Sequence, residues 1–206
     1  MRILTITFCL ITSLLHAQDN KANQILSNLS KKTASYSSIE AHFTNTFSSS
    51  ITSINESQTG VLFLQGDAYK LDLAGQSIIS DGETNWMLLK EDEEVNISEV
   101  EEDDEDIMNP SKIFTMYEEG YKSQFIKEEA GKYYIHLFPK EKGSFSRIEL
   151  VINKGKMQIE ELNMFDKQSS KYSYVISKFK TNKVYKESFF SFEKEKYPDF
   201  EIIDLR

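Results

Sequence analysis

Beyond residue 17, two histidines are the side chains best suited to general acid–base chemistry near neutral pH. His42 and His136 each fall in a segment whose alternating pattern predicts a β-strand, at a polar position. The chain has no His-Glu-x-x-His pair, no Gly-x-Ser-x-Gly elbow and no phosphate-binding glycine loop. We therefore expect solvated or hydrogen-bonded histidines, no catalytic residues and no enzymatic activity.

The densest group of potential metal ligands is an acidic run over residues 91–106. Calcium loops place oxygen ligands at fixed offsets around a glycine turn, and this run contains no glycine. A solvated acidic loop is the favoured interpretation, with weak cation binding as the alternative. No metal site and no cofactor are predicted.

Paired carboxylates could also hydrolyse a glycoside, because any two of the many acidic residues might meet in the folded chain. Nothing in the spacing singles out one pair. An exported hydrolase is therefore kept as a third alternative for function.

The first 17 residues are typical of a secretory signal peptide. Arg2 supplies the positive start, residues 3–15 form an apolar stretch, and Ala17 offers a small residue for cleavage. The apolar stretch is too short for a membrane-spanning helix, although an uncleaved anchor is the alternative. Cys9 follows Thr7 and Phe8, which is not the context of a lipoprotein signal. We expect a periplasmic protein cleaved after Ala17.

Cleavage would remove Cys9, which is the chain's one cysteine. The exported chain could then form no disulfide and no thiolate metal site, so its hydrophobic core alone must stabilise it. The net charge of −9 disfavours nucleic acid and anionic membrane surfaces as partners. No linker or repeat interrupts residues 18–206, which predicts a single domain and a monomer.

Helical spacing is confined to the start of the exported chain. The apolar residues of 22–29 predict an amphipathic helix, and residues 39–47 then alternate as a half-buried strand. A polar link is expected over 48–57. Farther on, Asp81-Gly82 predicts a hairpin turn, and Asn109-Pro110 predicts the start of a second, short helix.

Strand patterns dominate the rest of the chain. A turn is expected at 153–156, and a change of parity between Ile159 and Leu162 predicts a β-bulge near Glu160-Glu161. Residues 189–192 and 200–203 are predicted to be closing strands. The total is about eleven strands, which predicts a mainly β protein built as a large antiparallel sheet or barrel.

Large aromatic side chains are spread over these strands, and two interpretations stay open. They could simply fill a sandwich core. Alternatively, a curved sheet with only one or two helices to cover it leaves an apolar cavity that binds a ligand. The aromatic residues in question are Phe63, Tyr69, Trp86, Phe125, Tyr133, Phe138, Tyr172 and Tyr174.

The order of several short motifs resembles the LolA family of periplasmic outer-membrane lipoprotein carriers. After the first helix come Ser37-Ser38-Ile39-Glu40-Ala41-His42-Phe43-Thr44, Gly60-Val61-Leu62-Phe63 and Ser80-Asp81-Gly82-Glu83-Thr84-Asn85-Trp86. Phe190-Ser191-Phe192 and Pro198-Asp199-Phe200-Glu201-Ile202-Ile203-Asp204 are similar to the family's closing strands. Each motif alone is weak, and their order and spacing carry the resemblance.

The resemblance implies an unclosed β-barrel of about eleven strands with helices as a lid over its concave face. It implies that acyl chains of lipoproteins bind in the cavity, which is lined by Phe43, Phe63, Tyr69, Leu71, Trp86 and Leu88. The lid residues would be Leu26 and Leu29 in the first helix, and Ile113 and Phe114 in the second.

The family also implies partners. An inner-membrane ABC transporter would supply the acylated lipoproteins, and an outer-membrane acceptor is a further candidate. Well-studied members carry Arg-Pro after the strand matching residues 62–64, where this chain has Gln65-Gly66-Asp67. That difference and the acidic run favour either a divergent carrier or, as the alternative, a regulatory module that senses lipid or lipoprotein.

Overall fold

The computed structural model describes residues 4–100, 114–115, 117–141 and 143–206, with side chains from Asp19 onward. Its one α-helix among these residues, α1, spans Leu4–Ala34. The predicted helix of residues 22–29 is thus confirmed and is longer than expected. The side chains of the predicted signal peptide lie outside the described residues, and its cleavage stays a prediction. No helix among the described residues is both long and apolar enough to cross a bilayer.

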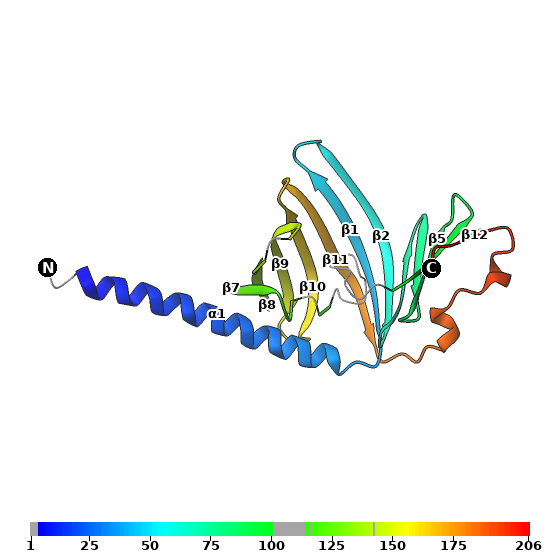
Figure 1. Ribbon diagram of the computed structural model, residues 1–206. Helices are drawn as coiled ribbons and strands as arrows, with labels where there is room; N and C mark the ends of the chain where they lie inside the picture. The colour runs from blue at the N-terminus through cyan, green and yellow to red at the C-terminus, as the bar shows by residue number, and fades with distance from the viewer. Residues whose placement is uncertain (1–3, 101–113, 116, 142) are drawn as a thin grey trace. The chain divides into compact units, whose positions relative to one another are not determined.

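Among the described residues, twelve strands form one sheet, several of which are labelled in Figure 1. The first six are β1 (Ile39–Ser49), β2 (Ile54–Gln65), β3 (Ala68–Leu73), β4 (Gln76–Ser80), β5 (Thr84–Leu89) and β6 (Glu94–Glu99). The second six are β7 (Tyr121–Glu129), β8 (Lys132–Pro139), β9 (Phe145–Asn153), β10 (Gln158–Asp166), β11 (Ser170–Thr181) and β12 (Glu201–Asp204). Two short 3-10 helices, η2 (Glu187–Phe190) and η3 (Lys194–Lys196), precede β12.

The strand order is β12-β6-β5-β4-β3-β2-β1-β11-β10-β9-β8-β7, so β12 and β7 are edges and the sheet does not close on itself. The predicted mainly β, unclosed architecture is confirmed, with twelve strands in place of about eleven. One pairing departs from the antiparallel prediction, because β12 runs parallel to β6, with Glu201 opposite Glu94.

Two local predictions are confirmed. The Asp81-Gly82 turn joins β4 to β5, and Gly82 has the positive φ of 100° that such a turn needs. The register between β9 and β10 shifts between Ile159 and Glu161, where the sequence predicts the bulge. After the shift, Leu162 and Met164 lie opposite Leu150 and Ile148, so all four apolar side chains share one face.

Two local predictions are wrong. Residues 48–57 are not a link, because β1 continues to Ser49, β2 begins at Ile54, and residues 50–53 form the turn. Hydroxyl-bearing residues remain in the strands here, and the Thr46 and Ser57 hydroxyls are 2.5 Å apart.

Residues 189–192 are not a strand. A 3-10 turn ends at Phe190, which lets the consecutive rings of Phe189 and Phe190 both contact Tyr185.

The described chain forms two compact units. The first unit comprises residues 1–34, 47–55 and 117–173, and the second comprises residues 35–46, 56–116 and 174–206. In the first unit, α1 contacts β7 and β10. The second unit holds β3 to β6 and residues 182–206, which include β12 and which we call the C-terminal segment. The assignment of residues 18–206 to a single domain stays a prediction.

Candidate lipid-binding face

An apolar row crosses four strands of the second unit. Leu62 on β2 lies opposite Leu71 on β3, Leu71 lies opposite Ile78 on β4, and Ile78 lies opposite Met87 on β5. Directly paired residues project from the same side of a sheet. Leu62 is buried, Leu71 and Ile78 are half-buried, and Met87 is 38% exposed. We call this side of β2–β5 the row face.

A second row on the same face is polar toward β5. Leu64 lies opposite Tyr69, which lies opposite Ser80, which in turn lies opposite Asn85. The Tyr69 hydroxyl donates a hydrogen bond to Asn85 Oδ1 over 3.0 Å. The row face therefore has a strip of aliphatic side chains, and beside it lies a buried tyrosine whose hydroxyl is hydrogen-bonded to Asn85.

Phe43 also belongs to the row face, because a glycine makes room for its ring. A side chain built at Gly60 would have its Cβ only 2.6 Å from Phe43 Cζ and 2.7 Å from Leu73 Cδ2. Gly60 lies opposite Leu73 and two positions before Leu62, so its missing side chain faces the same way as the apolar row. The Phe43 ring also contacts the Tyr174 ring, at 5.8 Å between centroids.

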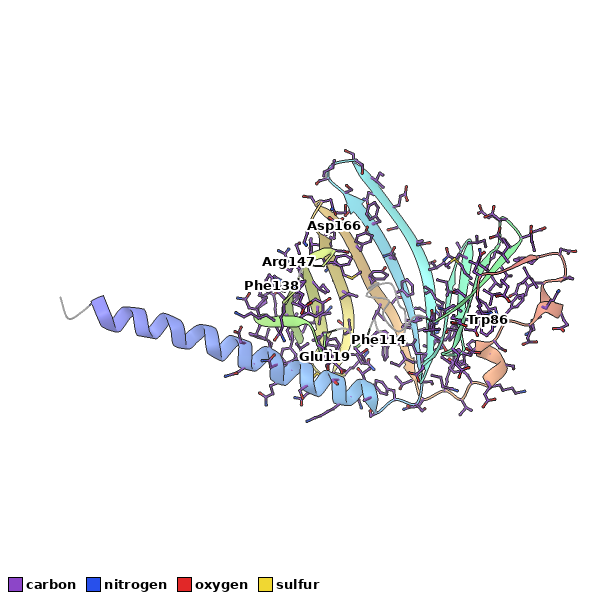
Figure 2. All side chains as sticks on the ribbon, in the orientation of Figure 1. Trp86, Phe114, Glu119, Phe138, Arg147 and Asp166 are labelled. Carbon is purple, nitrogen blue, oxygen red and sulfur yellow. The ribbon has the colours of Figure 1, made fainter. Side chains whose placement is uncertain are left out.

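The remaining candidate cavity residues project from the opposite side of the same strands, which we call the core face. Phe63 lies opposite Lys70, Ile79 lies opposite Trp86, and Leu88 lies opposite Val95. Trp86 (labelled in Figure 2) packs against a buried cluster of Ile79, Leu88, Val95 and Ile97. Four side chains of the C-terminal segment also pack on this cluster: Phe192, Tyr197, Phe200 and Ile202.

The structure therefore divides the six predicted cavity residues between two faces. Phe43, Tyr69 and Leu71 lie on the row face, and Phe63, Trp86 and Leu88 lie on the core face. Apolar residues occur at both parities of these strands, so the sequence could not say which parity belongs to a cavity. Strand register settles the division, and it adds Leu62, Ile78 and Met87, which sequence reasoning did not single out.

A buried carboxylate anchors the start of the C-terminal segment. Glu40 on β1 is 5% exposed and contacts Lys180 Nζ at 2.6 Å, Lys183 Nζ at 2.6 Å and His42 Nε2 at 2.8 Å. The Tyr185 hydroxyl donates to it over 3.2 Å. Hydrogen bonds lower the pKa of Glu40 far below its ordinary value, and the largest effect comes from Lys180, followed by Lys183 and His42.

Sequence reasoning did not find this network, because Lys180 and Tyr185 lie 140 and 145 positions away from Glu40. The alternating pattern places Glu40 at the solvent side of a strand. No local signal distinguishes a buried carboxylate from an exposed one when its partners come from the other end of the chain. The network places His42 in a structural role, hydrogen-bonded to Glu40.

In the first unit, α1 covers an apolar face of the sheet. Leu26 and Leu29 of α1 are buried, as are Leu137, Ile148 and Met164 on successive strands. Ser123 lies opposite Leu137, and its hydroxyl donates to Asn23 Oδ1 of α1 over 2.7 Å. Lys21 of α1 places its ammonium 3.8 Å from the centre of the Phe125 ring. The two predicted lid residues of the first helix thus belong to a helix that packs on the sheet.

The second predicted lid falls mostly outside the described residues, and Ile113 is among those not described. Phe114 is described. It lies in a turn, is buried, and contacts the Phe179 ring edge to face at 5.5 Å between centroids.

The second histidine lies on a strand of the first unit, beside a charged pair. His136 Nε2 lies 3.4 Å from Glu149 Oε1, and Glu149 also binds Arg147 Nη2 at 2.9 Å. Burial lowers the pKa of His136, an effect that Glu149 opposes. The part of the chain that the structure describes holds no group of three His, Cys, Asp or Glu residues placed to bind a metal ion. Residues 101–106 of the acidic run lie outside that part.

The fold is shared with solved structures of low sequence identity. An uncharacterised conserved protein from Thermus thermophilus aligns with a TM-score of 0.59 and 12% identity, over 89% of this chain and 99% of that one. The Mycobacterium tuberculosis lipoprotein LppX aligns with a TM-score of 0.50 and 13% identity, over 82% of this chain and 98% of that one. No curated protein matches the chain.

The family comparison covers most of the sequence. The model of the family described as outer membrane lipoprotein carrier protein LolA matches residues 34–193, which include the row face, the core face and the C-terminal segment up to Phe192. This match supports a lipid- or lipoprotein-binding module and confirms the resemblance drawn from the motifs. The chain belongs to the LolA family of outer membrane lipoprotein carrier proteins.

Proposed function

We propose that this protein is a non-enzymatic periplasmic carrier that holds the acyl chains of lipoproteins against its row face. The proposal rests on one observation: the row of Leu62, Leu71, Ile78 and Met87 is apolar, yet its exposure rises toward Met87. Buried apolar groups stabilise a fold, whereas partly accessible ones in a family of lipoprotein carriers are available to a ligand. On the core face, by contrast, side chains of the C-terminal segment pack on the four-residue cluster, which is at most 9% exposed.

The energetics of acyl chains constrain the mechanism. At about 0.8 kcal/mol per methylene, a three-chain anchor of about 45 methylenes loses on the order of 35 kcal/mol when it enters water. Spontaneous release into the periplasm would be far too slow to be useful. The carrier must therefore receive its cargo directly from an inner-membrane ABC transporter and pass it directly to an acceptor on the way to the outer membrane.

The binding part of the proposal is tested with a triacylated lipopeptide and native mass spectrometry. Leu71→Glu places a carboxylate in the middle of the apolar row, and we expect at least a roughly tenfold loss of lipopeptide binding. The matched control is Val184→Glu, because Val184 is 97% exposed and the same change there should leave binding intact. A folded Leu71→Glu variant that binds normally would remove the row face from the site.

If Leu71→Glu does not fold, Met87→Glu serves instead, since Met87 is already partly exposed and lies in the same row. The carrier part is tested on protein purified from its own periplasm. A triacylated polypeptide that co-purifies, and that moves to a membrane only in the presence of a partner, is the expected result. Turnover of a glycan or an ester would contradict it.

A further inference from the structure

Three chain connections meet at one end of the first unit. These are the β1–β2 turn (50–53), the described part of the β8–β9 connection (140–141 and 143–144) and the β10–β11 turn (167–169), which together we call the loop end. Phe145 at the start of β9 lies opposite Asp166 at the end of β10. The centre of the Tyr172 ring lies 5.0 Å from that of Phe47 near the end of β1 and 6.0 Å from that of Phe145 at the start of β9.

The loop end carries exposed aliphatic side chains. Ile51 is 72% exposed and Ile54 is 39% exposed, on a turn that Ser53 closes with a positive φ of 56°. Residues 44–55 contain no ionisable side chain, although 28% of the whole chain is charged. This turn could enter an apolar medium without the desolvation of any charge, which is the largest cost that a protein surface meets there.

Lysines lie on or beside the other two connections of the loop end. Lys140 and Lys167 are exposed, and Lys171 reaches the Phe165 ring at 5.7 Å from its ammonium to the ring centre. The acids nearby are Glu141 and Asp166, and Asp166 already accepts hydrogen bonds from the backbone N–H groups of Gln168 and Ser170 over 2.8 and 2.7 Å. A hollow of about 430 Å³ opens between the two lysine-bearing connections, with Ser144, Lys167 and Tyr172 in its lining.

We propose that the loop end docks on a lipid bilayer whose surface carries anionic headgroups. The isoleucines would enter the headgroup region, the lysines would bind lipid phosphates, and Tyr172 would lie at the interface, where aromatic hydroxyls concentrate. The chain's net charge of −9 opposes such binding only weakly, because charges beyond about 8 Å are screened at physiological salt.

A bilayer fits this surface better than a folded protein partner does. A specific protein interface buries on the order of 1,000 Å² or more in total, and two isoleucines on a narrow turn with three lysines supply little of that. A bilayer accepts single side chains and makes no demand for a complementary shape. This inference goes beyond cargo binding, since it concerns the cargo-free protein and a different part of the chain.

The test is flotation of the cargo-free protein, purified after cleavage of the predicted signal peptide, with vesicles of equal parts phosphatidylcholine and phosphatidylglycerol. We expect the wild type to bind, and the Ile51→Ser/Ile54→Ser variant to bind about tenfold more weakly. Both isoleucines are exposed, so the variant should fold. Val184→Ser removes an exposed aliphatic group from the second unit and should bind like the wild type.

A second variant isolates the electrostatic part. Lys140→Gln/Lys167→Gln should lose binding to the mixed vesicles. Its small residual binding to pure phosphatidylcholine should be unchanged. Added salt should likewise weaken the binding of the wild type to the mixed vesicles. The proposal is overturned if the wild type does not float, or if it floats only when the vesicles contain membrane protein. Normal lipopeptide capture by Ile51→Ser/Ile54→Ser would show that carrier function and bilayer docking are separate properties.

Discussion

The side-chain amide of Gln65 makes two hydrogen bonds to the backbone of Tyr185. Its Oε1 accepts from the Tyr185 N–H over 3.3 Å, and its Nε2 donates to the Tyr185 carbonyl over 3.5 Å. Gln65 is the last residue of β2, at the position for which the family resemblance implies an arginine. The hydrogen bonds of Gln65 link β2 to the C-terminal segment, whose side chains cover the core face.

We expect Gln65→Ala to lower the free energy of unfolding by about 1 kcal/mol, because two long hydrogen bonds are lost and Tyr185 is only partly buried. The C-terminal segment should also become more mobile at its start. Chemical denaturation gives the first quantity, and amide hydrogen exchange of residues 185–192 gives the second. Gln58→Ala is the control, since Gln58 is exposed on the same strand and should change neither.

The Glu40 network makes a prediction about pH. Because hydrogen bonds from lysine lower the pKa of Glu40 in the folded state, its charge stabilises the fold above the carboxyl's ordinary titration range, and this stabilisation is lost as the pH falls below that range. Glu40→Gln should therefore cost about 1–3 kcal/mol of unfolding free energy near pH 7. The difference between wild type and variant should shrink steadily below about pH 4.5.

The control for this experiment is Glu129→Gln. Glu129 pairs with Lys127 at 2.6 Å, but both side chains are at least half exposed, so the change should cost less than about 0.5 kcal/mol at any pH. A Glu40→Gln variant whose deficit is the same at pH 7 and pH 3 would show that the carboxylate's charge does not stabilise the fold.

A substitution at Gly60 tests how Phe43 packs on the row face. Gly60→Ala would place a methyl group closer than van der Waals contact to both the Phe43 ring and Leu73, so that one of them must shift, and we expect a loss of about 1–3 kcal/mol in stability. Phe43→Leu should relieve part of that clash, so the two changes together should cost less than their sum in a double-mutant cycle. Additive costs would mean that Phe43 does not occupy the space above Gly60.

Gly143→Ala is the matched control for Gly60, because nothing lies within 4 Å of a Cβ at that position. It should leave the unfolding free energy within about 0.5 kcal/mol of the wild type. The contrast separates crowding over the strand from the general effect of replacing a glycine with alanine, which restricts the unfolded chain at both positions.

The sequence determined the class of this fold and many of its parts. Alternation of apolar and polar residues predicted the strands, Asp81-Gly82 predicted a hairpin, and the parity change after Ile159 predicted a bulge. These are local signals, since each depends on residues within one or two strands. The ordered motifs were also enough to indicate the family that the match to residues 34–193 establishes.

Tertiary structure alone decided which apolar residues share a face and which charges are buried. Phe63 was predicted to line a cavity and Leu62 was not. Adjacent residues of a strand point to opposite sides, and only the strand pairing shows that Leu62 shares its side with Leu71 and Ile78, whereas Phe63 lies with Lys70. Glu40 can be buried because its carboxylate binds Lys180, Lys183 and Tyr185, which lie far away in the sequence. Register and long-range ion pairing depend on contacts between distant segments, and no local pattern encodes them.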